Sequence, residues 1–158
     1  MKFIKQLLHS YLDGEVFTAF DTETTGLNSK YEKIIEIGAV KFDKNGIIDT
    51  YSVLINPEKT ISSEITRITG ITNEMVADCK NFSEIAPSFL NFINETKLVA
   101  HNATSDVNFV NAELEKTPYK NLSKGQCNAL DTVKISRKVF PGLPFYKLQY
   151  LASHFGIK

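Results

Sequence analysis

The sequence is poor in the features that mark secreted, zinc-binding and membrane proteins. Only two of its 158 residues are cysteines, Cys79 and Cys127, and they lie well apart without the spacing of metal ligands. We therefore expect no disulfide scaffold and no zinc site, and we expect a reducing, cytoplasmic location. No apolar run near the N-terminus is long enough for a signal peptide or a membrane span, so no membrane partner is expected.

Net charge is also absent, because 18 basic residues balance 18 acidic ones. The charges are nevertheless unevenly placed. Residues 116–158 hold eight basic residues and one acid, Asp131, a net charge of +7 that leaves −7 on the rest of the chain. An acidic half could hold cations, and a basic half could follow a phosphate backbone. A solvated surface with uneven charge explains the same distribution equally well.

The N-terminal segment has apolar residues at helical spacing. These residues are Phe3, Ile4, Leu7, Leu8, Tyr11 and Leu12. A repeat of this kind predicts an amphipathic helix packed on the domain. The functional alternative is a helix that docks a partner.

The length and the hydrophobic content of 42% are typical of one globular domain, which we expect to span residues 1–158. The predicted strands are 16–20, 34–42, 47–55, 98–100 and 127–130. The predicted helices are 63–69, ended by Gly70, 83–94, capped by Ser83, and 104–116, 132–139 and 145–155. Asn45-Gly46 is a strong hairpin turn signal. This order favours a mixed sheet with helices on its faces.

Two acids follow the first predicted strand. In an extended chain residues i and i+2 share a face, so Asp21 and Glu23 should point to one side and Thr22 to the other. Like charges this close repel unless a cation lies between them, and Mg²⁺ and Mn²⁺ prefer carboxylate oxygens. Taken alone, the pair is more simply a charged strand end entering a solvated loop.

The next four residues favour the metal interpretation, because they turn the chain beside the two acids. Gly26 lets the backbone approach a ligand closely, Thr24 and Thr25 offer hydroxyls, and Leu27 offers an apolar wedge. The heptapeptide DTETTGL, directly after a buried strand, resembles the first motif of the DnaQ-like, or DEDD, 3′→5′ exonucleases. That family includes the proofreading epsilon subunit of bacterial DNA polymerase III.

The resemblance extends from about residue 16 to residue 157. Further matching segments are EIGAV at 36–40, ITGITNEM at 68–75, LVAHNATSDVNF at 98–109, LDT at 130–132, FP at 140–141 and LQYLA at 148–152. The segments occur in the family's order and at similar spacing. The resemblance implies an RNase H-like α/β fold with a five-stranded mixed sheet flanked by helices.

The family's chemistry implies roles for particular residues. Four acids in this family hold two divalent cations, Mg²⁺ or Mn²⁺, at the 3′ end of a strand. The resemblance makes Asp21, Glu23 and Asp106 catalytic residues and metal ligands, with Asp21 shared by both cations. The candidate substrate-binding residues are Thr24, Thr25, Gly26, Leu27, His101 and Asn102. A histidine satisfied by backbone at a strand end is an equally good interpretation of His101. We expect Asp131 to cap the helix that begins at Thr132.

The family's fourth acid belongs to a third motif, H-x-x-x-x-D or Y-x-x-x-D, which follows a helix similar to 147–155. The sequence ends at Gly156-Ile157-Lys158 without this motif, and its FGI phrase is similar to the histidine branch, DEDDh. We therefore expect a domain that lacks its C-terminal helix and third motif. A chain without a metal ligand and a general base should be nearly inactive.

The resemblance implies hydrolysis of nucleic acid, DNA in first place, from a single-stranded 3′ end to nucleoside 5′-monophosphates by two-metal catalysis. A DNA polymerase is the candidate protein partner. Three alternatives remain open: a non-catalytic module that binds nucleic acid ends or a polymerase, an RNA-trimming exoribonuclease, and a metal-dependent hydrolase of small nucleotides. Retention of Asp21, Glu23 and Asp106 favours catalysis over the non-catalytic module.

Overall fold

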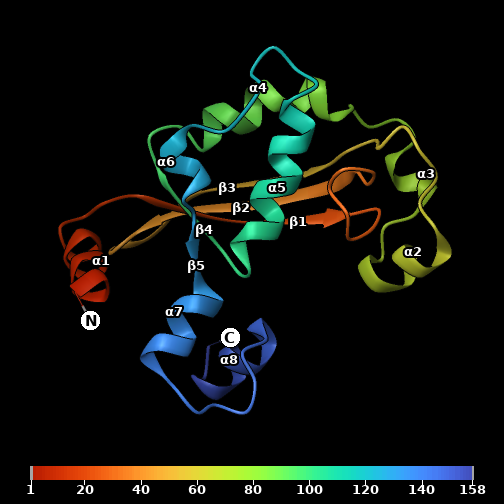
Figure 1. The fold of residues 1–158 in the computed structure, drawn as a ribbon. Helices are drawn as coiled ribbons and strands as arrows, with labels where there is room; N and C mark the ends of the chain where they lie inside the picture. Colours follow the sequence, from red (N-terminus) through yellow and green to blue (C-terminus); the bar gives the residue numbers. More distant parts are fainter. Residues whose placement is uncertain (1, 158) are drawn as a thin grey trace.

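A computed structural model describes residues 2–157 and contains one five-stranded sheet of order β3-β2-β1-β4-β5 (Figure 1). The strands are β1 (Phe17–Thr24), β2 (Ile34–Asp43), β3 (Gly46–Leu54), β4 (Lys97–Ala100) and β5 (Leu130–Asp131). The β1–β2 and β2–β3 pairs are antiparallel, whereas β1–β4 and β4–β5 are parallel. The predicted five-stranded mixed sheet is therefore confirmed.

Eight helices surround the sheet in this part of the chain. They are α1 (Lys2–Leu12), α2 (Ser63–Thr69), α3 (Asn73–Val76), α4 (Phe82–Phe92), α5 (Ala103–Leu114), α6 (Lys124–Cys127), α7 (Thr132–Val139) and α8 (Leu148–His154). In Figure 1, α4 lies on one side of the sheet and α7 and α8 lie on the other. Within residues 2–157, no helix combines the length and the apolar character needed to cross a bilayer.

The main core lies between the sheet and the helices α4 and α5. The Phe20 ring of β1 lies 6.3 Å from the Phe89 ring of α4, and Phe89 and Val110 are fully buried. Each buried side chain of this size contributes about 1.5–3 kcal/mol relative to an exposed one. This packing holds the beginning of α5 close to the end of β1.

The β2–β3 hairpin forms at the turn that the sequence indicates. Asp43 pairs with Gly46, whose φ of 126° suits a residue without a Cβ. The Asp43 carboxylate accepts a hydrogen bond of 2.7 Å from the Asn45 N–H. Both strands lie within one residue of their predicted bounds.

Three predicted boundaries are wrong. The first strand continues to Thr24 because its last residues pair with β2. The N-cap of α4 is Asn81, not Ser83, because Asn81 and Glu84 form a reciprocal capping box. The predicted helix 145–155 is limited to 148–154.

The predicted strand 127–130 is also largely wrong. Residues 124–127 form the helix α6 instead, and Ser123 and Gln126 form a second capping box at its N-terminus. Only Leu130 and Asp131 form the strand β5. The short helix α3 was not predicted.

The N-terminal helix α1 packs on the sheet with one face. Its Tyr11 ring lies 6.3 Å from the ring of Phe17 in β1. Phe3, Leu8 and Leu12 stay exposed, and no residue of α1 is fully buried. The amphipathic helix is confirmed, and its partner-docking alternative remains open.

Candidate active site

Asp21 and Glu23 lie in the central strand β1 and face the same side of the sheet. In the antiparallel register Asp21 is opposite Gly38 and Glu23 is opposite Glu36 of β2. Because Gly38 has no side chain, β2 does not cover Asp21, which remains accessible to solvent although neighbouring groups partly desolvate it. Directly opposed residues share a face of the sheet, so Glu36 is a third acid on this side.

Asp106 approaches the same strand from α5. It lies in the first turn of that helix and is 5% exposed. The Thr22 N–H and Oγ1–H both donate to Asp106 Oδ1, at 3.0 and 2.7 Å. Thr22 therefore connects Asp106 to the strand between the two acids, and Asp106 Oδ2 takes no part in these two bonds.

Burial and nearby negative charge oppose the ionisation of the acids. Burial raises the pKa of Asp106 to about 6, the charge of Asp21 adds to this effect, and the bonds from Thr22 oppose it. The pKa of Glu23 is raised by desolvation and then by the charges of Asp21, Glu36 and Asp106. Desolvation also raises the pKa of Asp21, against the effects of the Thr22 backbone and His101. A cation beside these groups would relieve the repulsion.

The donor chemistry of this cluster fits a hard divalent cation. Carboxylate oxygens that are partly desolvated and mutually repelling are the ligands that Mg²⁺ and Mn²⁺ prefer. Over residues 2–157, however, no three Asp, Glu, His or Cys side chains converge closely enough to hold an ion as they stand. Asp106 approaches β1 from the α5 side, whereas Asp21 and Glu23 point to the other side. A cation shared by all three acids would therefore have to be within reach of both faces of β1. The ligand set is therefore assembled in part and not closed.

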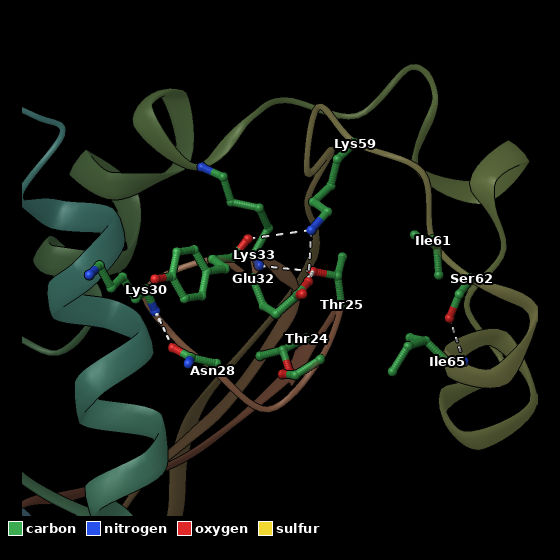
Figure 2. Close-up of polar contacts among 12 residues, drawn as sticks. Thr24, Thr25, Asn28, Lys30, Glu32, Lys33, Lys59, Ile61, Ser62 and Ile65 are labelled. Carbon is green, nitrogen blue, oxygen red and sulfur yellow. Dashed lines mark hydrogen bonds and ion pairs between the residues drawn. The ribbon is translucent and has the colours of Figure 1, made fainter.

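The loop after β1 uses its own hydroxyls. Thr24 Oγ1 donates to the Gly26 carbonyl at 2.7 Å, and Thr25 Oγ1 donates to Glu32 Oε2 at 2.5 Å (Figure 2). The hydroxyl groups of Thr24 and Thr25, which we expected to be available to a ligand, thus donate their hydrogens within the loop and stabilise its shape. Leu27 is 100% exposed, as an apolar wedge would be.

The β4–α5 junction carries His101 and Asn102. His101 Nδ1 lies 2.8 Å from Thr132 Oγ1, so the ring is satisfied by a side chain and not by backbone. Asn102 has a left-handed φ of 67°, a conformation in which asparagine is enriched. Its N–H donates to Asp131 Oδ1 at 3.2 Å, and the same carboxylate caps α7 through the Val133 N–H at 2.9 Å. The predicted capping role of Asp131 is confirmed.

A cavity of about 620 Å³ opens beside Asp21, with His101 and Asn102 in its wall. The other residues that line it are Val133, Arg137, Pro144, Phe145, Tyr146, Lys147, Leu148 and Gln149. The Arg137 guanidinium carbon lies 5.4 Å from the centroid of the Tyr146 ring, and Tyr146 Oη donates to the Phe140 carbonyl at 2.8 Å. The basic C-terminal segment therefore contributes directly to the surroundings of Asp21.

Sequence reasoning missed three of these features. It did not connect Thr22 with Asp106, and it overlooked Glu36 as an acid beside Glu23. It named Arg137 as a nucleic acid contact but not Tyr146, which packs beside it in the cavity wall. The alternation of β2 together with the register of β1 would have placed Glu36 on the acidic face. The other two features join segments that are distant in the chain and carry no local signal.

Comparison with known proteins identifies the family of the chain. The family model RNase_T, described as Exonuclease, matches residues 18–158. DNA polymerase III subunit epsilon of Treponema pallidum (strain Nichols) is 48% identical over 143 residues, which are 89% of this chain and 65% of that protein. DNA polymerase III PolC-type of Caldanaerobacter subterraneus subsp. tengcongensis is 43% identical over 147 residues, 93% of this chain and 10% of that protein. The chain thus spans less than two-thirds of the first relative and about a tenth of the second.

Solved structures share the fold. Exonuclease X in complex with 5′ overhanging duplex DNA superposes with a TM-score of 0.68 at 27% identity, covering 89% of this chain and 73% of that one. Product-bound exonuclease I gives a TM-score of 0.77 at 17% identity, covering 91% of this chain and 39% of that one, and shows similarity of fold alone. The family model covers most of the chain, and two relatives are more than 40% identical to it. The chain therefore belongs to the family of DnaQ-like 3′→5′ exonucleases.

Proposed function

We propose that this exonuclease domain removes nucleoside 5′-monophosphates from the 3′ end of single-stranded DNA, in proofreading for a replicative DNA polymerase. The observation that carries the proposal is the group of Asp21, Glu23 and Asp106 around Thr22, beside a cavity with basic and aromatic walls. The names of the relatives, subunits or forms of DNA polymerase III, support DNA as the substrate and a polymerase as the partner. The free cysteines Cys79 and Cys127 fit a reducing location such as the cytoplasm.

The three acids would hold two divalent cations, Mg²⁺ or Mn²⁺. Such ions supply an activated water and stabilise the leaving 3′ oxyanion when bound. Asp21 and Glu23 offer carboxylate oxygens on one side of β1, Asp106 offers them from the α5 side, and Glu36 adds negative charge beside Glu23. Once the acids are ionised, the repulsion between Asp106 and Asp21 favours capture of a cation, which would relieve it.

The substrate strand would bind along the cavity beside Asp21. Arg137 and Lys147 line this cavity and would neutralise phosphates. Phe145 is 59% exposed and offers a ring on which a base can stack. Leu27 would wedge against the terminal base. His101 and Asn102, at the cavity wall, would contact the terminal phosphate or its water.

The proposal is tested by binding and by product release. Calorimetry with Mn²⁺ should detect binding to the wild-type protein and strongly weakened binding to Asp21→Ala. Fluorescence anisotropy should show that a 5′-labelled single-stranded oligonucleotide binds more tightly with a free 3′ hydroxyl than with a 3′ phosphate. Matched DNA and RNA oligonucleotides of one sequence separate the two substrate classes. Equal Mn²⁺ binding by wild type and Asp21→Ala, or indifference to the 3′ block, would reject the proposed site.

A second candidate function is a non-catalytic module that binds nucleic acid ends. It is favoured by the ligand set, which is not closed in residues 2–157. Release of mononucleotides from a 3′-labelled strand with Mn²⁺ distinguishes the two functions. Because the ligand set is not closed in residues 2–157, even the exonuclease should release mononucleotides slowly. Slow release that Asp21→Ala abolishes supports the exonuclease, whereas 3′-end binding with release no faster than that of Asp21→Ala supports the binding module.

A further inference from the structure

The loop between β1 and β2 is held by a residue pair outside the motif itself. We propose that Glu32 and Lys59 are positioning residues that keep the Thr24–Leu27 loop in its substrate-binding shape before a strand arrives. The inference rests on the proposed function in one respect, namely that this loop contacts the 3′-terminal nucleotide. Neither residue touches the acids, so their effect would be transmitted through Thr25 and Gly26.

Thr25 is fixed by three hydrogen bonds at the base of the loop. Its N–H donates to the Lys33 carbonyl at 2.8 Å, and the Lys33 N–H donates back to Thr25 Oγ1 at 2.9 Å. The Thr25 hydroxyl then donates to Glu32 Oε2 at 2.5 Å. With its hydrogen given to Glu32 and its oxygen accepting from Lys33, the hydroxyl has one orientation.

Lys59 anchors Glu32 from a different part of the chain. It lies in the segment between β3 and α2, and its Nζ donates to Glu32 Oε2 at 2.8 Å and to the Tyr31 carbonyl at 3.3 Å. Figure 2 shows Lys59 and Thr25 both reaching the Glu32 carboxylate. The pKa of Glu32 is lowered chiefly by Lys59 and then by Thr25, so the carboxylate remains ionised at neutral pH.

Gly26 completes the arrangement by its lack of a side chain. A Cβ at this position would lie 2.8 Å from Glu32 Cγ and 2.9 Å from Glu32 Cδ. The backbone of the loop therefore rests directly on the Glu32 stem. The only large side chain that the loop projects fully into solvent is Leu27, which is 100% exposed.

These contacts matter for binding more than for folding. Glu32 and Lys59 are partly exposed, with side-chain exposures of 26% and 38%, and surface ion pairs of this kind contribute little to stability. A loop already ordered in the free protein does not have to be ordered on binding, which raises affinity. Loss of the pair should therefore weaken DNA binding while the protein stays folded.

The test compares Glu32→Ala, which removes both contacts, with Glu32→Gln, which keeps an oxygen for Thr25. Lys59→Met and Thr25→Val interrupt the chain of contacts at its two ends. Glu115→Ala and Lys80→Met are matched controls, because both residues are exposed and neither side chain forms a hydrogen bond or ion pair within residues 2–157. The measurements are anisotropy of a 5′-labelled single-stranded DNA with a free 3′ hydroxyl in Ca²⁺, hydrogen exchange of the Thr25 and Lys33 amides, and thermal unfolding.

We expect Glu32→Ala and Thr25→Val to raise Kd about tenfold and to accelerate exchange of the two amides, since the loop must then be ordered on binding. Glu32→Gln and Lys59→Met should raise Kd about two- to fivefold, because each retains part of the contact chain. The controls should bind as wild type does, and Mn²⁺ affinity should not change in any variant. If the Kd of Glu32→Gln is closer to that of wild type than the Kd of Glu32→Ala is, the contact between Glu32 and Thr25 is the one that orders the loop.

The outcomes separate the two proposals. If wild type binds the free 3′ end and Glu32→Ala binds it equally well, the positioning role is wrong and the proposed function stands. If wild type shows no preference for a free 3′ end, the proposed function fails. In that case hydrogen exchange of the Thr25 and Lys33 amides still tests whether Glu32 orders the loop. Unchanged exchange in Glu32→Ala overturns the positioning role.

Discussion

Replacing Asp106 by asparagine should stabilise the metal-free protein while it impairs metal binding. The asparagine Oδ1 can still accept the two hydrogen bonds from Thr22, so the local contacts are kept. The charge, which burial and Asp21 disfavour, is removed. The substitution therefore separates the energetic cost of this acid from its structural contacts.

The magnitude follows from the raised pKa of Asp106. Its pKa moves from an ordinary value of 3.8 to about 6. One pKa unit corresponds to about 1.36 kcal/mol, so ionised Asp106 costs the folded protein up to about 3 kcal/mol at pH 8. For a chain of this length that corresponds to an increase in Tm of up to about 6–12 °C for Asp106→Asn.

The sign of the pH dependence follows from the same pKa. A carboxyl group with a raised pKa in the folded state binds more protons there, so the wild-type protein loses stability as pH rises from about 4 to about 6. The advantage of Asp106→Asn should be full above that window and should vanish near pH 4. Asp78→Asn, which changes an exposed aspartate, is the matched control.

Thermal and urea unfolding in EDTA at pH 4, 6 and 8 measure this difference. Addition of Mn²⁺ at pH 8 should raise the Tm of wild type more than that of Asp106→Asn, because ligand binding stabilises only the folded state. A variant less stable than wild type at pH 8, or a difference independent of pH, would refute the reasoning.

Three further predictions concern the surroundings of the acids. Mn²⁺ affinity should fall steeply below about pH 6 in calorimetric titrations, because protons compete for Asp106. An affinity that does not change between pH 5 and pH 8 would contradict this. Asp131→Ala should lower the free energy of unfolding by about 1–2 kcal/mol in urea titrations, since α7 loses its cap and the Asn102 N–H loses its acceptor. Exchange of Arg137 or Lys147 for glutamine should weaken DNA binding and reduce the slope of log K against log salt by about 0.7 each, and an unchanged slope would exclude a phosphate contact.

Local sequence determined those features whose causes lie within a few residues. The Asn45-Gly46 turn set the β2–β3 hairpin, and alternation placed Asp21 and Glu23 on one face of β1. Asp131 was recognisable as a cap because its partners, the Val133 and Lys134 N–H groups, follow it directly. Turns, caps and alternation arise from short-range sterics and hydrogen bonds, which the chain carries in its order of residues.

Only the tertiary structure decided which distant groups meet. Thr22 and Asp106 are 84 residues apart, and they bond because α5 packs on the sheet beside the end of β1. Glu36 joins the acids through strand register, and Lys59 reaches Glu32 from a segment 27 residues further along the chain. Such contacts depend on how strands pair and helices pack, and many residues far apart in the sequence determine that packing together.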